Sequence, residues 1–300
     1  MIPYTAFVEG EGKRVIQRLR KDILQEEANI FRLVLVRGSL WEEAVLRPAS
    51  TCLNCYSISK SFTATAVGIA CDQGLLSLED PILPYLEAEL PSAFDDRLRR
   101  VRVRHLLTHT MGNAEGYLFE ADRYTYPERN WARLILSRPL AYEPGERFCY
   151  SNTHYYLLSC LLHRATGRSL LAFLQETLFV PLDIVGCAWE TCPRGETMGA
   201  TGLYISTADM AKLGLLYLQR GQWQGERIFS SHWAEEAPRR QTPEAAYGYG
   251  FWIHPDGFEM NGAHGQTVRV YPGEKLILAA HAYLEAFDYQ ALLRRAGLLP

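Results

Sequence analysis

The order of the predicted elements indicates a mixed α/β fold, with one antiparallel sheet built from both chain ends. Two β-rich segments, Ile30 to Val36 and Leu40 to Leu46, stand near the N-terminus. Strand patterns return only near the C-terminus, as short runs joined by turns: Tyr249–His254, Gly257–Asn261, Thr267–Tyr271 and Leu276–Ala282. Because helical patterns fill the interval, we expect strands from both ends to share one sheet that helices cover.

Helical periodicity predicts the remaining elements. Gly12 to Glu26 carries apolar residues at helical spacing. Ser57 to Gly74 is apolar on nearly every face, so this helix is expected to be buried. Phe287 to Leu299 would form a last helix packed on the sheet. Further helices are expected at Arg104–Thr108, Asn130–Leu136, Thr153–Ala165, Ser169–Leu178 and Ser206–Arg220.

The helical block divides the predicted fold into two lobes. Residues 1–80 and 195–300 would form a discontinuous α/β sandwich domain, and residues 81–194 an all-helical lobe. With 300 residues, 48% of them hydrophobic, the chain can bury a large core.

Charge and composition argue against several classes of partner. The net charge is −3 and the basic residues are scattered, so we expect no nucleic-acid partner. Met1 to Thr5 leads into a charged stretch without an apolar signal core, and no apolar run is long enough to span a membrane. We therefore expect a cytoplasmic protein that does not bind membranes.

The seven cysteines are an odd number and lie mostly in apolar surroundings, which favours reduced thiols. Cys52 and Cys55 form a Cys-x-x-Cys pair, but no second pair completes a zinc tetrad. We expect neither a metal nor an organic cofactor.

The tetrapeptide Ser57-Ile58-Ser59-Lys60 places a serine and a lysine one helical turn apart at a helix start. Side chains at i and i+3 share a helix face, so the Lys60 amine can hydrogen-bond the Ser57 hydroxyl. The positive end of the helix dipole adds charge where an oxyanion would form. A buried lysine can lose its proton near neutral pH and act as a base. Taken alone, the pair also fits a helix cap followed by a surface lysine.

Tyr150-Ser151-Asn152 lies between a Pro-Gly turn and a predicted helix. The Tyr150 phenol could carry a proton to Ser57, while Asn152 could orient Lys60 or hydrogen-bond a substrate carbonyl. The alternatives are a core tyrosine and a helix N-cap.

These motifs together resemble the serine β-lactamase and penicillin-binding-protein-like superfamily, on the branch with class C β-lactamases, related esterases and nylon-oligomer hydrolases. The resemblance extends over roughly residues 50 to 282. Its segments, in order, are Ser57–Thr63, Val103–Gly112, Pro144-Gly145 leading to Tyr150–Asn152, Pro181-Leu182, Gly202–Lys212 and Tyr247–Gly250. Ordered agreement over this length is too specific for chance.

The resemblance implies an α/β sandwich and an all-helical lobe, with the active site in the cleft between them. It implies that Ser57 is acylated, that Lys60 activates it, and that Tyr150 passes a proton to the leaving group. Two backbone N–H groups would bind the oxyanion, one from Ser57 and one from Ala263 on the strand at the edge of the site.

The third motif departs from the family, because the usual Lys-Thr-Gly is absent. Two registers are possible, Met260-Asn261-Gly262 or Ala263-His264-Gly265. We favour the first, since Gly262 to Gln266 resembles the Gly-x-His-Gly-Gln of the nylon-oligomer hydrolase branch. Gly262 would let the strand pass close to substrate, and His264 is either a polar cleft residue or a structural imidazole. Met260 would replace the cation that anchors a β-lactam carboxylate.

We accordingly expect a serine hydrolase that cleaves a small-molecule ester or amide, or a peptide-like substrate, through an acyl-enzyme on Ser57. One alternative is a β-lactamase or D-Ala-D-Ala carboxypeptidase. Another is a catalytically inactive homologue that binds ligands.

Overall fold

The computed structural model describes residues 12–300, so the expectation about a signal sequence at Met1 to Thr5 lies outside the described residues. Its largest feature is a six-stranded antiparallel sheet with the order β2-β1-β11-β10-β9-β8. The strands are β1 (Ile30–Arg37), β2 (Leu40–Val45), β8 (Trp252–His254), β9 (Gly257–Gly262), β10 (Gln266–Tyr271) and β11 (Leu276–Ala282). β1 pairs with β11, from Ile30 opposite Ala282 to Arg37 opposite Leu276. Both chain ends therefore form one sheet, which confirms the predicted fold class.

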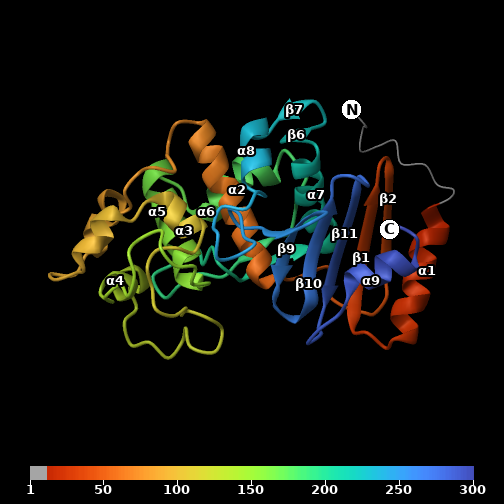
Figure 1. Ribbon diagram of the computed structural model, residues 1–300, viewed down its shortest axis with the longest axis horizontal. Coiled ribbons are helices and arrows are strands. Elements are labelled where there is room, and N and C mark those ends of the chain that lie inside the picture. Colours follow the sequence, from red (N-terminus) through yellow and green to blue (C-terminus); the bar gives the residue numbers. More distant parts are fainter. Residues whose placement is uncertain (1–11) are drawn as a thin grey trace.

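Helices cover both faces of this sheet (Figure 1). On one face lie α1 (Gly12–Gln25) and α9 (Tyr289–Arg295), whose apolar side chains form a core with Leu33, Leu35 and Leu278 of the sheet. The other face packs on α7 (Thr207–Leu218) and contributes Val268 and Val270 to the main core. A Cβ at Gly214 of α7 would lie 3.0 Å from Val268, so the helix approaches the sheet closely. Because successive side chains of a strand point to opposite faces of the sheet, the sheet lies between two separate hydrophobic cores.

The helix α2 (Ser59–Asp72) runs through the middle of the molecule and is buried from Ser59 to Ala70, as its sequence predicts. It begins two residues later than expected. Tyr56 has a φ of 49°, outside the right-handed helical region, and residues 56–58 form a single 3₁₀ turn instead. Ser57 therefore lies in this turn, directly before α2.

Beyond α2, the named elements from residue 83 to residue 179 are all helical, with long irregular segments between them. The α-helices there are α3 (Val103–Leu107), α4 (Trp131–Leu136), α5 (Asn152–Thr166) and α6 (Leu170–Leu174), and they lie on the side of α2 away from the sheet (Figure 1). The predicted helix Ser169–Leu178 is present but changes geometry part-way: its α-helical part ends at Leu174, and Gln175 to Phe179 continue it as a π turn.

Several short elements were not predicted. β3 (Cys52–Asn54), β5 (Leu203–Ser206) and β4 (Ala188–Trp189) form a three-stranded sheet, so residues 81–194 are not helical throughout. The others are β6 (Gln222–Trp223), β7 (Glu226–Arg227) and α8 (Ser231–Glu236). Elements of two to six residues carry too little periodicity to stand out in a sequence.

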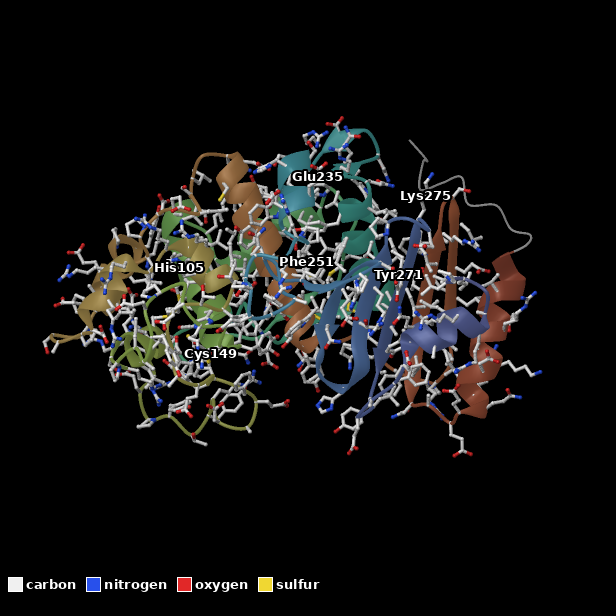
Figure 2. All side chains as sticks on the ribbon, in the orientation of Figure 1. His105, Cys149, Glu235, Phe251, Tyr271 and Lys275 are labelled. Carbon is white, nitrogen blue, oxygen red and sulfur yellow. The ribbon has the colours of Figure 1, made fainter. Side chains whose placement is uncertain are left out.

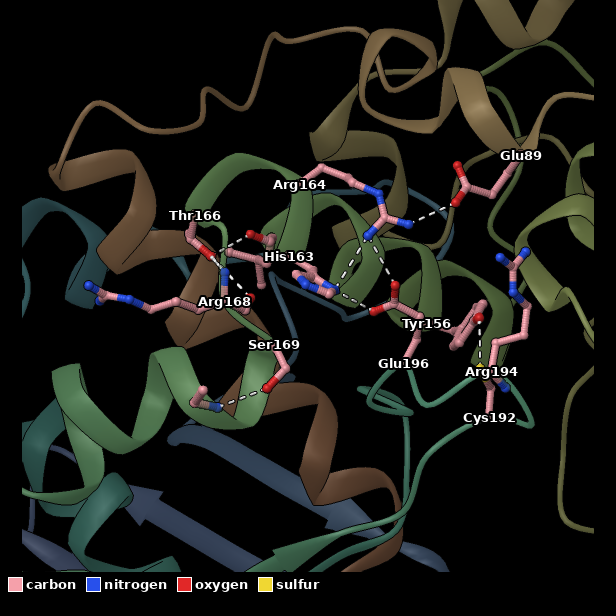
Figure 3. Close-up of polar contacts among 12 residues, drawn as sticks. Glu89, Tyr156, His163, Arg164, Thr166, Arg168, Ser169, Cys192, Arg194 and Glu196 are labelled. Carbon is pink, nitrogen blue, oxygen red and sulfur yellow. Dashed lines mark hydrogen bonds and ion pairs between the residues drawn. The ribbon is translucent and has the colours of Figure 1, made fainter.

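A polar network holds the segment after β4 against the end of α5 (Figure 3). The Arg164 guanidinium pairs with Glu89 at 2.8 Å and with Glu196 at 3.0 Å. His163 Nδ1 also lies 2.8 Å from Glu196, and the Tyr156 hydroxyl donates to Cys192 Sγ at 3.3 Å. The network therefore anchors residues 192–196, which lead directly to a loop that contacts α2.

In residues 12–300, no helix combines the length and the apolar character that a membrane span requires.

Candidate active site

Ser57 and Lys60 meet at the start of α2, and their exposure differs. The Lys60 Nζ atom lies 3.0 Å from Ser57 Oγ. Lys60 is only 1% exposed, whereas Ser57 is partly exposed. Burial lowers the pKa of the Lys60 amine to about 7, because water can no longer solvate the ammonium. Near neutral pH a large fraction of this amine is therefore unprotonated.

Two further acceptors surround the Lys60 amine. Nζ donates to Asn152 Oδ1 at 2.7 Å and to the Ala200 carbonyl at 2.9 Å. The Asn152 amide is itself oriented, since its Nδ2 donates to the Leu118 carbonyl at 2.9 Å. A neutral amine has two N–H bonds and one lone pair. In the protonated form Nζ donates to Ser57 Oγ. In the neutral form, with both N–H bonds directed to Asn152 and Ala200, the lone pair is left to accept the Ser57 proton.

Tyr150 lies beside this pair, one residue before the N-cap of α5. Burial raises the pKa of its phenol to about 12, although the nearby Ser57 hydroxyl acts to lower it. The Lys60 Nζ atom lies 4.7 Å from the centre of the Tyr150 ring. At neutral pH the phenol is therefore protonated and available as a proton donor.

Aromatic rings enclose Tyr150 on several sides. The centre of its ring lies 4.5 Å from that of His109, 5.7 Å from that of Trp252 and 6.1 Å from that of Tyr247. Trp252 belongs to β8 of the sheet, and His109 follows α3 in the helical region. The sheet and the helical region therefore both contribute rings around Tyr150. The sequence did not predict the contacts of Tyr150 with His109, Trp252 or Tyr247. The only signal for any of them was that His109 and Tyr247 lie within the segments that resemble the family.

The end of β9 passes directly beside the turn that holds Ser57. A Cβ on Gly262 would lie 2.4 Å from the Cys55 carbonyl oxygen, so only glycine fits without a backbone shift. Among the described residues, the ladder from β8 to β9 ends at the pair Trp252 and Glu259, which leaves the last residues of β9 at the sheet edge. Ala263, which follows Gly262, is exposed.

The other predicted residues of the third motif have different surroundings. Met260 is fully buried and belongs to the main core, so its side chain does not reach the open part of the site. His264 is partly exposed and has a φ of 60°. Its ring stacks on Tyr283, with 4.6 Å between centroids, and meets Tyr56 edge-on at 5.0 Å. His264 is therefore part of an aromatic wall beside Ser57.

Across residues 12–300 there is no cluster of three or more His, Cys, Asp and Glu side chains that could hold a metal ion.

A family model described as Beta-lactamase matches residues 30–295. The chain belongs to the beta-lactamase family. This match confirms the resemblance to serine β-lactamases and penicillin-binding proteins.

Individual proteins that are similar to this chain share only a modest part of its sequence. An uncharacterized protein of Alkalihalophilus pseudofirmus is 25% identical over 286 residues, which cover 80% of this chain and 77% of that protein. Penicillin-binding protein 4* of Bacillus subtilis is 30% identical over 131 residues, covering 42% of this chain but only 28% of that protein.

Among solved structures, a putative 6-aminohexanoate-dimer hydrolase from Bacillus anthracis superimposes with a TM-score of 0.78 at 18% identity. The superposition covers 92% of this chain and 80% of that one. At this level of identity, the likeness shows a shared fold.

Proposed function

We propose that the protein is a serine hydrolase that cleaves a small ester or amide through an acyl-enzyme on Ser57. One observation carries the proposal: a buried amine, with a pKa near 7, lies 3.0 Å from a partly exposed serine hydroxyl. A buried lysine that is held neutral at the side of an accessible hydroxyl is suited to act as its base.

The proposed acylation step balances its protons within three side chains. Neutral Lys60 takes the Ser57 proton while Oγ attacks the substrate carbonyl carbon. The backbone N–H groups of Ser57 and Ala263 bind the resulting oxyanion. Tyr150 gives its proton to the leaving oxygen or nitrogen as that bond breaks, and protonated Lys60 then restores the phenol. Water attacks the acyl group in the second half of the reaction, with the proton transfers reversed.

The surroundings of Ser57 favour neutral or cationic substrates over anionic ones. Exposed Tyr204 donates a hydrogen bond to Glu190 at 3.3 Å. Burial raises the pKa of Tyr56, and the nearby charges of Glu120 and Glu190 raise it further. The nearby Arg123 already pairs with Glu190 at 2.8 Å. Aromatic faces and carboxylates attract cations, so we expect this region to disfavour the carboxylate of a β-lactam.

A β-lactamase or D-Ala-D-Ala carboxypeptidase is the second candidate, and the family membership and the kinship with penicillin-binding protein 4* favour it. A comparison of turnover separates the two candidates. We expect a nitrophenyl ester to be hydrolysed faster than a chromogenic cephalosporin, and the reverse order would favour the second candidate.

Labelling with a fluorophosphonate tests the serine mechanism itself. The reagent should form a stable adduct on the peptide that contains Ser57, identified by mass spectrometry, and Ser57→Ala should prevent it. Wild-type protein that remains unlabelled would favour a catalytically inactive, ligand-binding homologue.

A further inference from the structure

Tyr150 lies in a segment with no regular secondary structure, because residues 147–150 run irregularly between a turn and α5. Neither helix nor strand geometry fixes its ring, yet the proposed proton transfer needs the hydroxyl at a defined place beside Ser57. We propose that His109 is the positioning residue that holds Tyr150 there; this inference rests on the proposed hydrolase function.

His109 binds the chain on both sides of Tyr150. Its carbonyl accepts the N–H of Cys149 at 2.8 Å, and its Nδ1 atom lies 3.4 Å from the N–H of Ser151. Between these two contacts, its ring lies against the Tyr150 ring, with 4.5 Å between centroids. One residue thus contacts three consecutive residues, of which the middle one is Tyr150.

A second histidine holds His109 in turn. The two Nδ1 atoms of His109 and His154 lie 2.9 Å apart, and His154 Nε2 lies 3.0 Å from Asn113 Oδ1. Two nitrogens facing each other at this distance share one proton, so at least one ring is neutral. Both histidines are fully buried, and burial lowers the pKa of His154 to about 3 and that of His109 well below its usual range. The pair therefore adds no positive charge beside Lys60.

Stability alone does not account for a histidine at position 109. Its Nε2 atom is buried and has no hydrogen-bond partner among the described residues, an arrangement that costs free energy. Its φ of 58° is also uncommon outside glycine. Both costs persist in a residue that contacts the proposed proton donor, as is typical of functional positions.

His105 provides the matched control. It lies on α3, four residues before His109 and in the same helical part of the molecule as Cys149 (Figure 2). It too is buried, but its Nδ1 atom accepts a hydrogen bond from the backbone N–H of Arg102 at 3.1 Å. Arg102 is the N-cap of α3, so this bond stabilises the start of that helix. A His105→Ala variant therefore removes a buried imidazole from the same segment without removing a contact to Tyr150 that the structure records.

The test compares two esters of one acid, an alkyl ester and a nitrophenyl ester. An alkoxide must be protonated as it leaves, whereas nitrophenolate leaves without a proton, so misplacement of Tyr150 slows mainly the alkyl ester. His109→Gly keeps the positive φ and the backbone carbonyl but removes the ring. We expect its kcat/KM for the alkyl ester, which reports acylation and not the hydrolysis of the shared acyl-enzyme, to fall about 10²-fold. The kcat/KM for the nitrophenyl ester should change by less than about tenfold.

His109→Asn should show partial rescue, with an alkyl-ester kcat/KM only about tenfold below wild type. Asparagine tolerates positive φ and offers an amide group, with both a donor and an acceptor, in place of Nδ1, but it lacks the ring contact. This variant also carries the test if His109→Gly fails to fold. His105→Ala should lower the two esters equally or leave both unchanged.

Equal losses for both esters in a folded His109 variant, or no loss, would overturn the inference. Wild-type protein that neither labels with fluorophosphonate nor hydrolyses either ester would instead refute the proposed function. Measuring the wild type first separates the two failures.

Discussion

The amine of Lys60 and the hydroxyl of Ser57 lie 3.0 Å apart, yet only Ser57 has access to solvent. Asn152, the Ala200 carbonyl and Tyr150 shield the amine from water. This burial lowers the pKa of Lys60, so that much of the amine is uncharged near neutral pH. The hydroxyl remains open to an incoming carbonyl carbon. This difference in exposure underlies the predictions that follow.

Ser57→Ala and Lys60→Ala should each lower kcat by on the order of 10³-fold or more, because members of a nucleophile–base unit fail together. The double variant should be no slower than either single variant. Turnover of a nitrophenyl ester, corrected for spontaneous hydrolysis, measures the effect. A Lys60→Ala enzyme of near-normal rate would contradict the assignment, as would an adduct on Ser59.

The pH dependence of kcat/KM should follow the ionisation of Lys60. A base must be unprotonated, and the pKa of Lys60 is lowered to about 7. Activity should therefore fall about tenfold per unit as pH drops below this value. It should stay level above it, because Tyr150, with a pKa raised to about 12, keeps its proton. A profile measured between pH 5 and 9 that shows no loss on the acid side would exclude Lys60 as the base.

Gly262→Ala should reduce kcat/KM by about 10²-fold, because the added methyl group displaces either β9 or the turn that holds Ser57. The new Cβ would lie 2.4 Å from the Cys55 carbonyl oxygen, a backbone atom that cannot turn away. Gly273→Ala is the matched control, since a Cβ there meets nothing within 4 Å. Comparable kinetics for the two variants, at similar melting temperatures, would argue against a role of β9 in the site.

Glu190→Gln should shift substrate preference toward carboxylates. The substitution removes the negative charge that neutralises Arg123, whose guanidinium lies 2.8 Å from Glu190 and is nearly buried. The relative kcat/KM of a carboxylate-bearing ester over its neutral isostere should rise about threefold to tenfold, which corresponds to roughly 0.7–1.4 kcal/mol. Glu120→Gln removes a negative charge near Tyr56 without releasing the Arg123 guanidinium, so it should raise the ratio less. An unchanged ratio in both variants would exclude this electrostatic account of specificity.

The sequence predicted the long elements well, because each buries an apolar face whose period is visible locally. β1, β11 and α2 lie where the pattern placed them, within two residues at each end. The short strands β3, β4 and β5 were missed, since each has only two to four residues and is held by pairing with partners far along the chain.

The same division applies to the candidate site. The sequence by itself determined the contact between Ser57 and Lys60, because residues at i and i+3 meet on any helical turn. Only the tertiary structure decided what surrounds Lys60: Asn152 is 92 residues away along the chain and Ala200 is 140 residues away. Ala200 acts through its carbonyl, which every residue possesses, so its sequence position carried no signal. The lowered pKa of Lys60 comes from this long-range burial, and burial exists only once distant segments have packed together.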